Sequence, residues 1–145
     1  MVPGGYFAIL EKDEDTILVQ FPQHSTINTF GYDWEHAEEM AREALSAALE
    51  ADFERGYKLP PVKKPRAKKG RKVVFIPLEP EVRTAYMLRA WREEAGLTQK
   101  QMAGRLGVSY QAYQRMERPG RSNLTVSTLE RVARALDKQL LIKMQ

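Results

Sequence analysis

Four side chains on one short segment carry the hydrogen-bonding groups that read DNA bases. They face away from the apolar positions of a helix that we expect to start after Ser109. The candidates are Tyr110, Gln111, Gln114 and Arg115. In a major groove, a Gln amide matches the edge of adenine and an Arg fork matches the edge of guanine. We therefore assign base contacts to this helix.

Two short helices joined by a turn are needed to present such a helix. Thr98 and Gln101 form a capping-box pattern at the start of the first helix. Gly107 can adopt positive φ where that helix ends, and Ser109 is a good N-cap for the second helix. Inward-facing apolar residues recur at helical spacing: Met102, Ala103, Leu106, Ala112, Tyr113 and Met116. The agreement of these signals over residues 97–117 predicts a helix-turn-helix.

A second set of polar residues flanks these helices and suits contact with the DNA backbone. Contacts to phosphates fix the register of a protein on DNA without reading sequence. The candidates are Gln99, Arg118, Arg121, Ser122 and Asn123.

From about Val82 to Leu141 the chain resembles the lambda-repressor-like (Cro/C1, or Xre) DNA-binding family. The resemblance rests on residues 97–99, 106–109, 116–117 and 129–136. It implies that Gln99 touches a phosphate and that residues 110, 111 and 115 face bases. It also implies an ion pair between Arg92 and Glu117 inside the fold, which makes both residues structural.

Charge is distributed unevenly along the chain. Residues 1–57 carry a net −9, residues 58–72 a net +8 and residues 73–145 a net +5. The basic C-terminal part suits a phosphate backbone, where counterion release drives binding. The acidic N-terminal part repels DNA and attracts a basic partner. For residues 58–72 we keep two interpretations, a solvated linker and a clamp on DNA of any sequence.

The N-terminal half has a separate pattern of strands and one helix. Residues 6–10 and 16–21 are rich in β-branched and aromatic residues and predict a hairpin, followed by a short strand at Ile27–Phe30. Asp33 can cap a helix from Trp34 to about Phe53, whose apolar stripe needs a sheet to cover it. Residues 73–76 predict a further strand, so the order is β-β-β-α-β.

This pattern resembles the HicB family of antitoxins over about residues 5–78. The resemblance rests on residues 6–10, 19–22, 29–37 and 74–77, together with the alanine-rich helix. It implies a partial RNase-H-like sheet without nuclease activity. It also implies binding of HicA, a small basic ribonuclease toxin, and repression of the shared promoter through the appended DNA-binding domain.

Composition excludes several other classes of protein. Cysteine is absent, and His24 and His36 have no ligand spacing around them, so we expect no disulfide, metal site or cofactor. We expect each histidine to be exposed or to have a hydrogen-bonding partner. The chain has no apolar run of membrane-span length and no signal peptide, which favours a cytoplasmic protein.

We weighed an enzyme against these binding functions. A nuclease of the RNase H type needs several carboxylates around divalent metal ions. Acidic residues occur at 13–15 and again at Asp33 and Glu35, but nothing in the sequence brings the two groups together. We therefore expect no enzymatic activity.

The sequence thus predicts an α+β protein of two domains. Residues 1–78 form a HicB-like toxin-binding domain that includes the basic linker 58–72. Residues 79–145 form an all-α helix-turn-helix domain with a short terminal β-strand. We expect an antitoxin that neutralises a HicA-type toxin and represses its own operon by binding operator DNA. The alternative is a one-component repressor whose N-terminal domain senses a small ligand.

The last residues favour association of two copies. Residues 138–144 are apolar and β-rich, and an exposed strand edge invites pairing with another chain. We expect a homodimer or higher oligomer whose two recognition helices lie about one DNA turn apart. The other interpretation is that this segment covers the core of its own domain.

Overall fold

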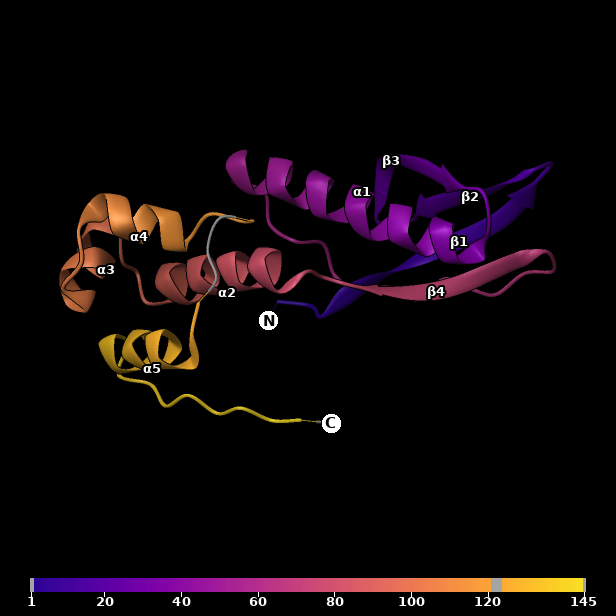
Figure 1. The fold of residues 1–145 in the computed structure, drawn as a ribbon. Coiled ribbons are helices and arrows are strands. Elements are labelled where there is room, and N and C mark those ends of the chain that lie inside the picture. The colour runs from indigo at the N-terminus through magenta and orange to yellow at the C-terminus, as the bar shows by residue number, and fades with distance from the viewer. Residues whose placement is uncertain (1, 121–123, 145) are drawn as a thin grey trace. The chain divides into compact units, whose positions relative to one another are not determined.

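The computed structural model describes residues 2–120 and 124–144 (Figure 1). The chain forms two compact units that divide between Arg83 and Thr84. We call Val2–Arg83 the N-terminal unit and the part from Thr84 onward the C-terminal unit. The N-terminal unit is α+β and contains the sheet, and the C-terminal unit is α-helical and contains the helix-turn-helix, as the sequence patterns indicate.

One antiparallel sheet with the spatial order β3-β2-β1-β4 forms the N-terminal unit. Its strands are β1 (Gly5–Asp13), β2 (Thr16–Phe21), β3 (His24–Gly31) and β4 (Arg71–Pro77). The hairpin between β1 and β2 turns at residues 14–15, because Asp13 pairs with Thr16. At the outer edge β4 pairs with β1 along its whole length. The order β-β-β-α-β is therefore confirmed.

β3 is longer than the predicted strand Ile27–Phe30. It begins at His24, which pairs with Phe21 directly after the two-residue turn. The sequence pattern missed these first residues because Ser25 and Thr26 are polar and both exposed, where the pairing of β2 with β3 shifts register between Gln20 and Phe21.

Helix α1 (Trp34–Glu54) packs against one face of this sheet (Figure 1). Asp33 caps it as predicted, since its carboxylate accepts a hydrogen bond from the backbone N–H of His36 at 2.7 Å. The four fully buried helix residues recur at helical spacing: Ala37, Ala41, Leu45 and Leu49. They meet the inward-facing residues Tyr6, Ala8, Leu10, Ile17, Val19, Phe21 and Ile76.

The opposite face of the sheet also bears apolar residues. The strand register places Phe7 opposite Phe75, Ile9 opposite Val73 and Leu18 opposite Phe30 on this face. Phe30 and Phe75 are 45% and 46% exposed. An antiparallel sheet usually presents polar side chains on its solvated face, so this apolar composition is unusual.

The basic stretch between α1 and β4 is attached to the sheet at two points. The hydroxyl of Tyr6 donates to the carbonyl of Pro60 at 2.7 Å, and Nε2 of Gln23 donates to the carbonyl of Lys63 at 2.6 Å. We call residues 57–70 the connector. Most of its side chains are exposed, which agrees with a solvated segment, but its path is set by these two hydrogen bonds.

Four helices make up the C-terminal part: α2 (Pro80–Glu94), α3 (Gln99–Leu106), α4 (Tyr110–Met116) and α5 (Val126–Ala135). Their core consists of Leu88, Met102, Ala103, Leu106, Tyr113, Val132 and Leu136. Trp91, Leu97, Val108 and Met116 pack against this core from partly buried positions. The predicted inward stripe of α3 therefore lines this core, together with Tyr113 and Met116 of the α4 stripe, whereas Ala112 is partly buried outside it.

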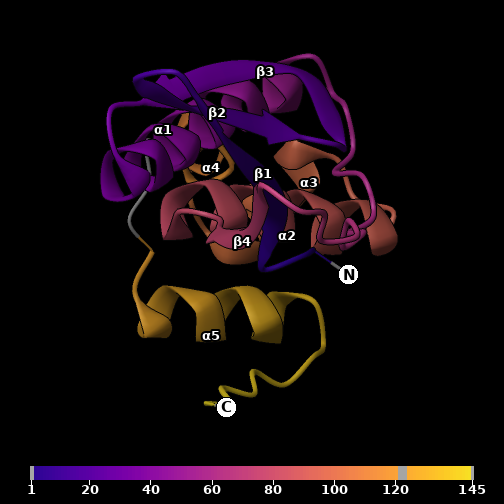
Figure 2. The same ribbon diagram turned by 90° about the vertical axis from the view of Figure 1, so that its right-hand side faces the viewer.

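The predicted terminal β-strand is wrong for the single chain. Residues 138–144 follow α5 without regular structure (Figure 2). A strand needs a hydrogen-bonding partner, and the described residues of the C-terminal unit provide only helices. Leu141, Ile142 and Met144 are left 85%, 63% and 93% exposed, so they do not cover the core of their own unit.

None of the helices in the described part of the chain combines the length and the apolar character that crossing a membrane requires.

Candidate nucleic-acid interface

Helix α3 begins with the capping box that the sequence predicts. The hydroxyl of Thr98 accepts from the backbone N–H of Gln101 at 3.1 Å, and the side chain of Gln101 accepts from the backbone N–H of Thr98 at 2.9 Å. Two backbone N–H groups at the helix start are therefore satisfied without tertiary contacts. This cap fixes where Gln99, the first residue of α3, stands in the fold.

The turn between α3 and α4 is closed by Gly107. Its φ of 68° lies in the left-handed region, which residues other than glycine adopt only with strain. The N–H of Val108 reaches back to the carbonyl of Ala103 at 3.1 Å. Ser109 then starts α4, with its hydroxyl accepting from the N–H of Ala112 at 3.0 Å. This local chemistry fixes how α4 leaves the turn.

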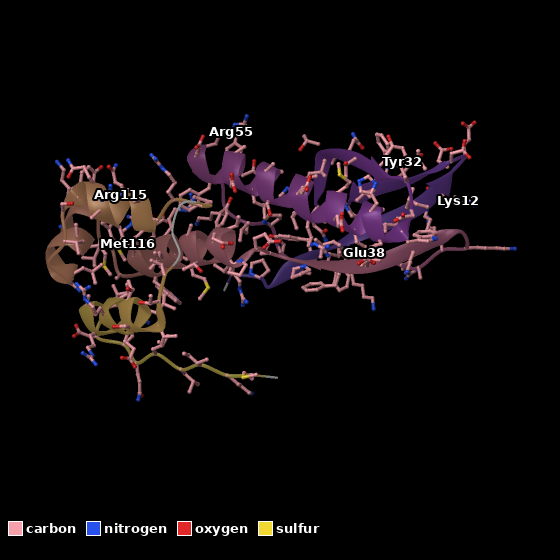
Figure 3. All side chains as sticks on the ribbon, in the orientation of Figure 1. Lys12, Tyr32, Glu38, Arg55, Arg115 and Met116 are labelled. Carbon is pink, nitrogen blue, oxygen red and sulfur yellow. The ribbon has the colours of Figure 1, made fainter. Side chains whose placement is uncertain are left out.

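Helix α4 separates a buried side from an exposed side. Tyr113 is fully buried, while Gln111 and Arg115, one helical turn apart, are exposed. Figure 3 shows Arg115 on the outer side of α4 and Met116 toward the core. Within the described residues, neither Gln111 nor Arg115 has a side-chain hydrogen-bond partner. Among the described residues, no group therefore competes with an external ligand for these two side chains.

The other two predicted base-contacting residues are coupled to each other. Nε2 of Gln114 donates to the hydroxyl of Tyr110 at 2.9 Å, and both side chains are partly buried. Nζ of Lys100 lies 5.5 Å from the centre of the Tyr110 ring. Tyr110 and Gln114 thus form a hydrogen-bonded pair. This pair leaves the carbonyl oxygen of Gln114 and the hydroxyl proton of Tyr110 for a ligand.

A buried ion pair braces this arrangement from beneath. The guanidinium of Arg92 binds the carboxylate of Glu117 through two nitrogens, at 2.9 Å and 2.7 Å, and donates a third bond to the carbonyl of Leu97 at 2.9 Å. Glu117 is only 1% exposed. Hydrogen bonding to Glu117 raises the pKa of Arg92. The ion pair that the Cro/C1 resemblance implies is present, and it ties α2 to the end of α4.

Tyr113 lies in the same buried region. Burial, and then the negative charge of Glu117, raise the pKa of the Tyr113 hydroxyl well above its usual value. The group stays neutral at every physiological pH, so its role is in packing rather than in proton transfer.

The predicted phosphate contacts fall into two sets. Gln99 is half-buried at the first position of α3, and Arg118 is exposed directly after α4. Three further predicted contacts lie outside the described residues: Arg121, Ser122 and Asn123. Gln99 and Arg118 thus occupy positions next to the two ends of the helix-turn-helix.

Sequence reasoning missed several basic residues of this unit. Lys100 was passed over, although it stands beside Gln99 on the first turn of α3 and reaches the Tyr110 ring. Arg105 donates to the carbonyl of Ala135 at 3.0 Å, and Arg131 donates to the carbonyl of Leu106 at 2.9 Å. Each arginine satisfies a carbonyl at the end of the other helix, which joins α3 to α5.

The acidic residues considered for catalysis do not gather into a metal site. Within residues 2–120 and 124–144, the structure has no group of three or more His, Asp or Glu side chains that could hold a metal ion.

Comparison with known proteins agrees with the geometry of the C-terminal unit. Residues 88–142 match the family model described as "Helix-turn-helix", which is of the Cro/C1 type. A search of curated proteins found no match to the chain. The C-terminal unit is therefore a helix-turn-helix domain, a class of domain that binds DNA sequence-specifically and regulates transcription.

Proposed function

We propose that the chain is an antitoxin that also represses its own operon. In this proposal the helix-turn-helix domain binds operator DNA, and the N-terminal unit binds and blocks a HicA-type ribonuclease toxin in the cytoplasm. The chain acts by binding alone and has no catalytic step of its own. The observation that carries the proposal is the combination of a β-β-β-α-β unit with a helix-turn-helix domain, in a chain whose first 57 residues carry a net −9.

For operator binding, Gln111 and Arg115 read bases, supported by the coupled pair Tyr110 and Gln114. The exposure of Gln111 and Arg115, and the lack of side-chain partners for them among the described residues, support this role. Gln99 and Arg118 hold phosphates next to the two ends of the helix-turn-helix. Basic side chains outnumber acidic ones after residue 72, which supplies the sequence-independent part of the affinity.

Arg115→Ala tests base readout. We expect it to weaken binding to the promoter upstream of this gene by about 1–3 kcal/mol and to flatten the base preference at one position. The measurement is a titration of promoter DNA and of random-sequence DNA at one salt concentration. Arg134→Ala is the control, because Arg134 is an exposed arginine on α5. Equal weakening on both DNAs would show that Arg115 contacts a phosphate instead.

The antitoxin role is tested by co-expression with the product of the adjacent gene. A short neighbouring reading frame that encodes a basic protein is the expected toxin. We expect this protein to co-purify with the chain and to lose its growth inhibition in its presence. Growth inhibition that persists with the chain present in excess contradicts the antitoxin role and leaves the repressor with a ligand-sensing N-terminal unit.

Dimerisation through the C-terminal tail belongs to the same proposal. The exposure of Leu141, Ile142 and Met144 supports pairing of residues 138–144 with the same segment of a second copy. Light scattering on a chain shortened to end at Asp137 tests it. We expect the shortened chain to be monomeric where the full chain is dimeric, and an unchanged dimer would remove this role for the tail.

A further inference from the structure

An exposed stack of aromatic rings lies where β3 passes into α1. Phe30 and Tyr32 are 45% and 71% exposed, and Tyr32 is the most exposed aromatic side chain among the described residues. The ring centres of Phe30 and Tyr32 are 5.7 Å apart in an edge-to-face arrangement. The rings of Tyr32 and His36 are stacked, with centres 5.4 Å apart and planes only 14° from parallel. We call Phe30, Tyr32 and His36 the ring stack.

The backbone beneath the ring stack is held rigidly. The N–H of Tyr32 donates to Nδ1 of His36 at 3.1 Å. Asp33, the next residue, caps α1 by accepting a hydrogen bond from the backbone N–H of the same His36. A Cβ atom at Gly31 would lie only 2.2 Å from the backbone nitrogen of Ala37, so the strand and the helix touch at this point. Rings that are exposed but already ordered lose little conformational entropy when a partner binds. Exposed Tyr and Trp residues of this kind dominate the affinity of protein interfaces.

The charges around the ring stack select the kind of partner. Asp33 and Glu35 follow Tyr32 in the chain, and the pairing of Ile17 with Gly31 brings the turn at Glu14 and Asp15 beside it. These four side chains are acidic and outnumber Lys12, which pairs with Ile17, and Lys72 at this end of the sheet. The balance of charge therefore disfavours the phosphates of a nucleic acid and attracts a cation. The face of an aromatic ring also attracts a cation. At the same end of the sheet, Nζ of Lys72 already lies 5.4 Å from the centre of the Trp34 ring.

We propose that the ring stack is the site at which the N-terminal unit receives an arginine or lysine side chain of a basic protein partner. The cation lies over the exposed face of Tyr32, and the neighbouring carboxylates neutralise its charge. This inference rests on the proposed function for the identity of the natural partner, the toxin. The site itself follows from the rings and the charges.

Substitutions at Tyr32 in the full chain test the proposal with a defined probe, an arginine-rich peptide. We expect Tyr32→Ala to weaken binding about fivefold to thirtyfold, a range that runs from an exposed to a desolvated cation–π contact. Tyr32→Phe keeps the ring and should bind as the unchanged chain does. Tyr57→Ala is the matched control, because Tyr57 is a 57% exposed tyrosine after the end of α1. Binding that is unchanged in Tyr32→Ala, or equally weakened in Tyr57→Ala, overturns the proposal.

Two further titrations separate the outcomes. A single-stranded RNA oligonucleotide replaces the peptide in one of them. Loss of RNA binding in Tyr32→Ala with peptide binding retained would make the ring stack a nucleic-acid platform and overturn the inference. The toxin from the adjacent gene is the ligand in the other. Tight toxin binding that Tyr32→Ala leaves unchanged overturns this inference alone, whereas a toxin that the unchanged chain does not bind overturns the proposed function and leaves the peptide result standing.

Discussion

The exposed residues of α4 and those of the β3–α1 junction differ in chemical kind. On α4, Gln111 and Arg115 are long polar side chains without partners in the described part of the chain. At the junction, Phe30 and Tyr32 are rings that already touch each other. Polar groups that keep their hydrogen-bonding capacity can read base edges, and preordered rings provide contact area at a low entropic cost. One chain thus carries two exposed surfaces whose chemistry suits different types of ligand.

The scaffolds beneath these two surfaces also differ. The C-terminal unit supports α4 with a buried ion pair between Arg92 and Glu117 and with helix caps that are local in sequence. The N-terminal unit supports its rings by close backbone packing at Gly31. The first kind of support is broken by removing a charge, and the second by adding a methyl group. Each of the following changes should therefore affect one unit and spare the other.

Glu117→Ala should have the largest effect. It leaves the buried guanidinium of Arg92 without its carboxylate, which costs about 3–5 kcal/mol in the stability of the C-terminal unit. Chemical denaturation followed by circular dichroism measures the loss of helix. Glu130→Ala breaks the exposed pair with Arg134 and should change stability by less than about 1 kcal/mol. Similar losses from the two variants would show that the buried pair does not brace the unit.

Gly31→Ala should destabilise the N-terminal unit by about 3 kcal/mol. The new Cβ meets the backbone of Ala37, which cannot move without shifting the start of α1. The affinity of the C-terminal unit for promoter DNA should be the same in Gly31→Ala as in the unchanged chain, and a DNA titration measures it. Gly4→Ala is the control, since a Cβ there meets no atom within 4 Å. An equally stable Gly31→Ala variant would mean that the junction is not rigid.

Gly104→Ala should stabilise the C-terminal unit by about 0.5–1 kcal/mol. Gly104 lies inside α3, and a Cβ there meets no atom within 4 Å. Alanine favours the helix because it loses less backbone entropy than glycine on folding. Thermal denaturation measures the gain. A loss of DNA binding without a loss of stability would show that α3 approaches the DNA closely at this position.

The smallest effect is a pH dependence in the N-terminal unit. Burial lowers the pKa of His24, against the opposing effect of Asp52, whose Oδ2 lies 3.8 Å from Nδ1. The ring of Tyr6, another titratable group, packs edge-to-face against the His24 ring. The unfolded chain binds the proton more tightly, so stability is fully present above pH 6.5 and falls as the pH drops toward the folded pKa. We expect His24→Gln to remove this part of the slope in denaturation measured from pH 7.5 to pH 5. An unchanged slope would show that another group is responsible.

Local signals made much of this fold predictable. Thr98, Gly107 and Ser109 act on residues three or four positions away, so their roles can be read from the chain directly. The order of elements along the N-terminal half, β-β-β-α-β, and the Asp33 cap followed from similar short patterns. The exposure of Gln111 and Arg115 followed from the period of α4, whereas Tyr110 and Gln114, predicted to face out as well, are partly buried. The Arg92–Glu117 pair was implied by resemblance rather than by spacing.

Contacts between distant segments were not predictable in this way. Nothing local signals that Gln23 holds the connector, or that Arg105 and Arg131 close the ends of each other's helices. His24 was expected to be exposed or satisfied, yet it is buried, and its Nε2 has no hydrogen-bonding partner among the described residues. The ring stack was missed for a different reason: its members lie within seven residues, but they span the end of a strand, a bend and the start of a helix, which no single period describes.

The place of β4 after the connector determines what a protease would release. A single cut within residues 57–70 leaves β4 covalently joined to the DNA-binding half, while its hydrogen-bonded neighbour β1 stays on the other fragment. After the peptide bond is cleaved, the backbone hydrogen bonds between β1 and β4 would still hold the two fragments together. Cleavage alone would therefore not separate the half that carries the helix-turn-helix domain from β1, and removal of either fragment would require the β1–β4 hydrogen bonds to break as well.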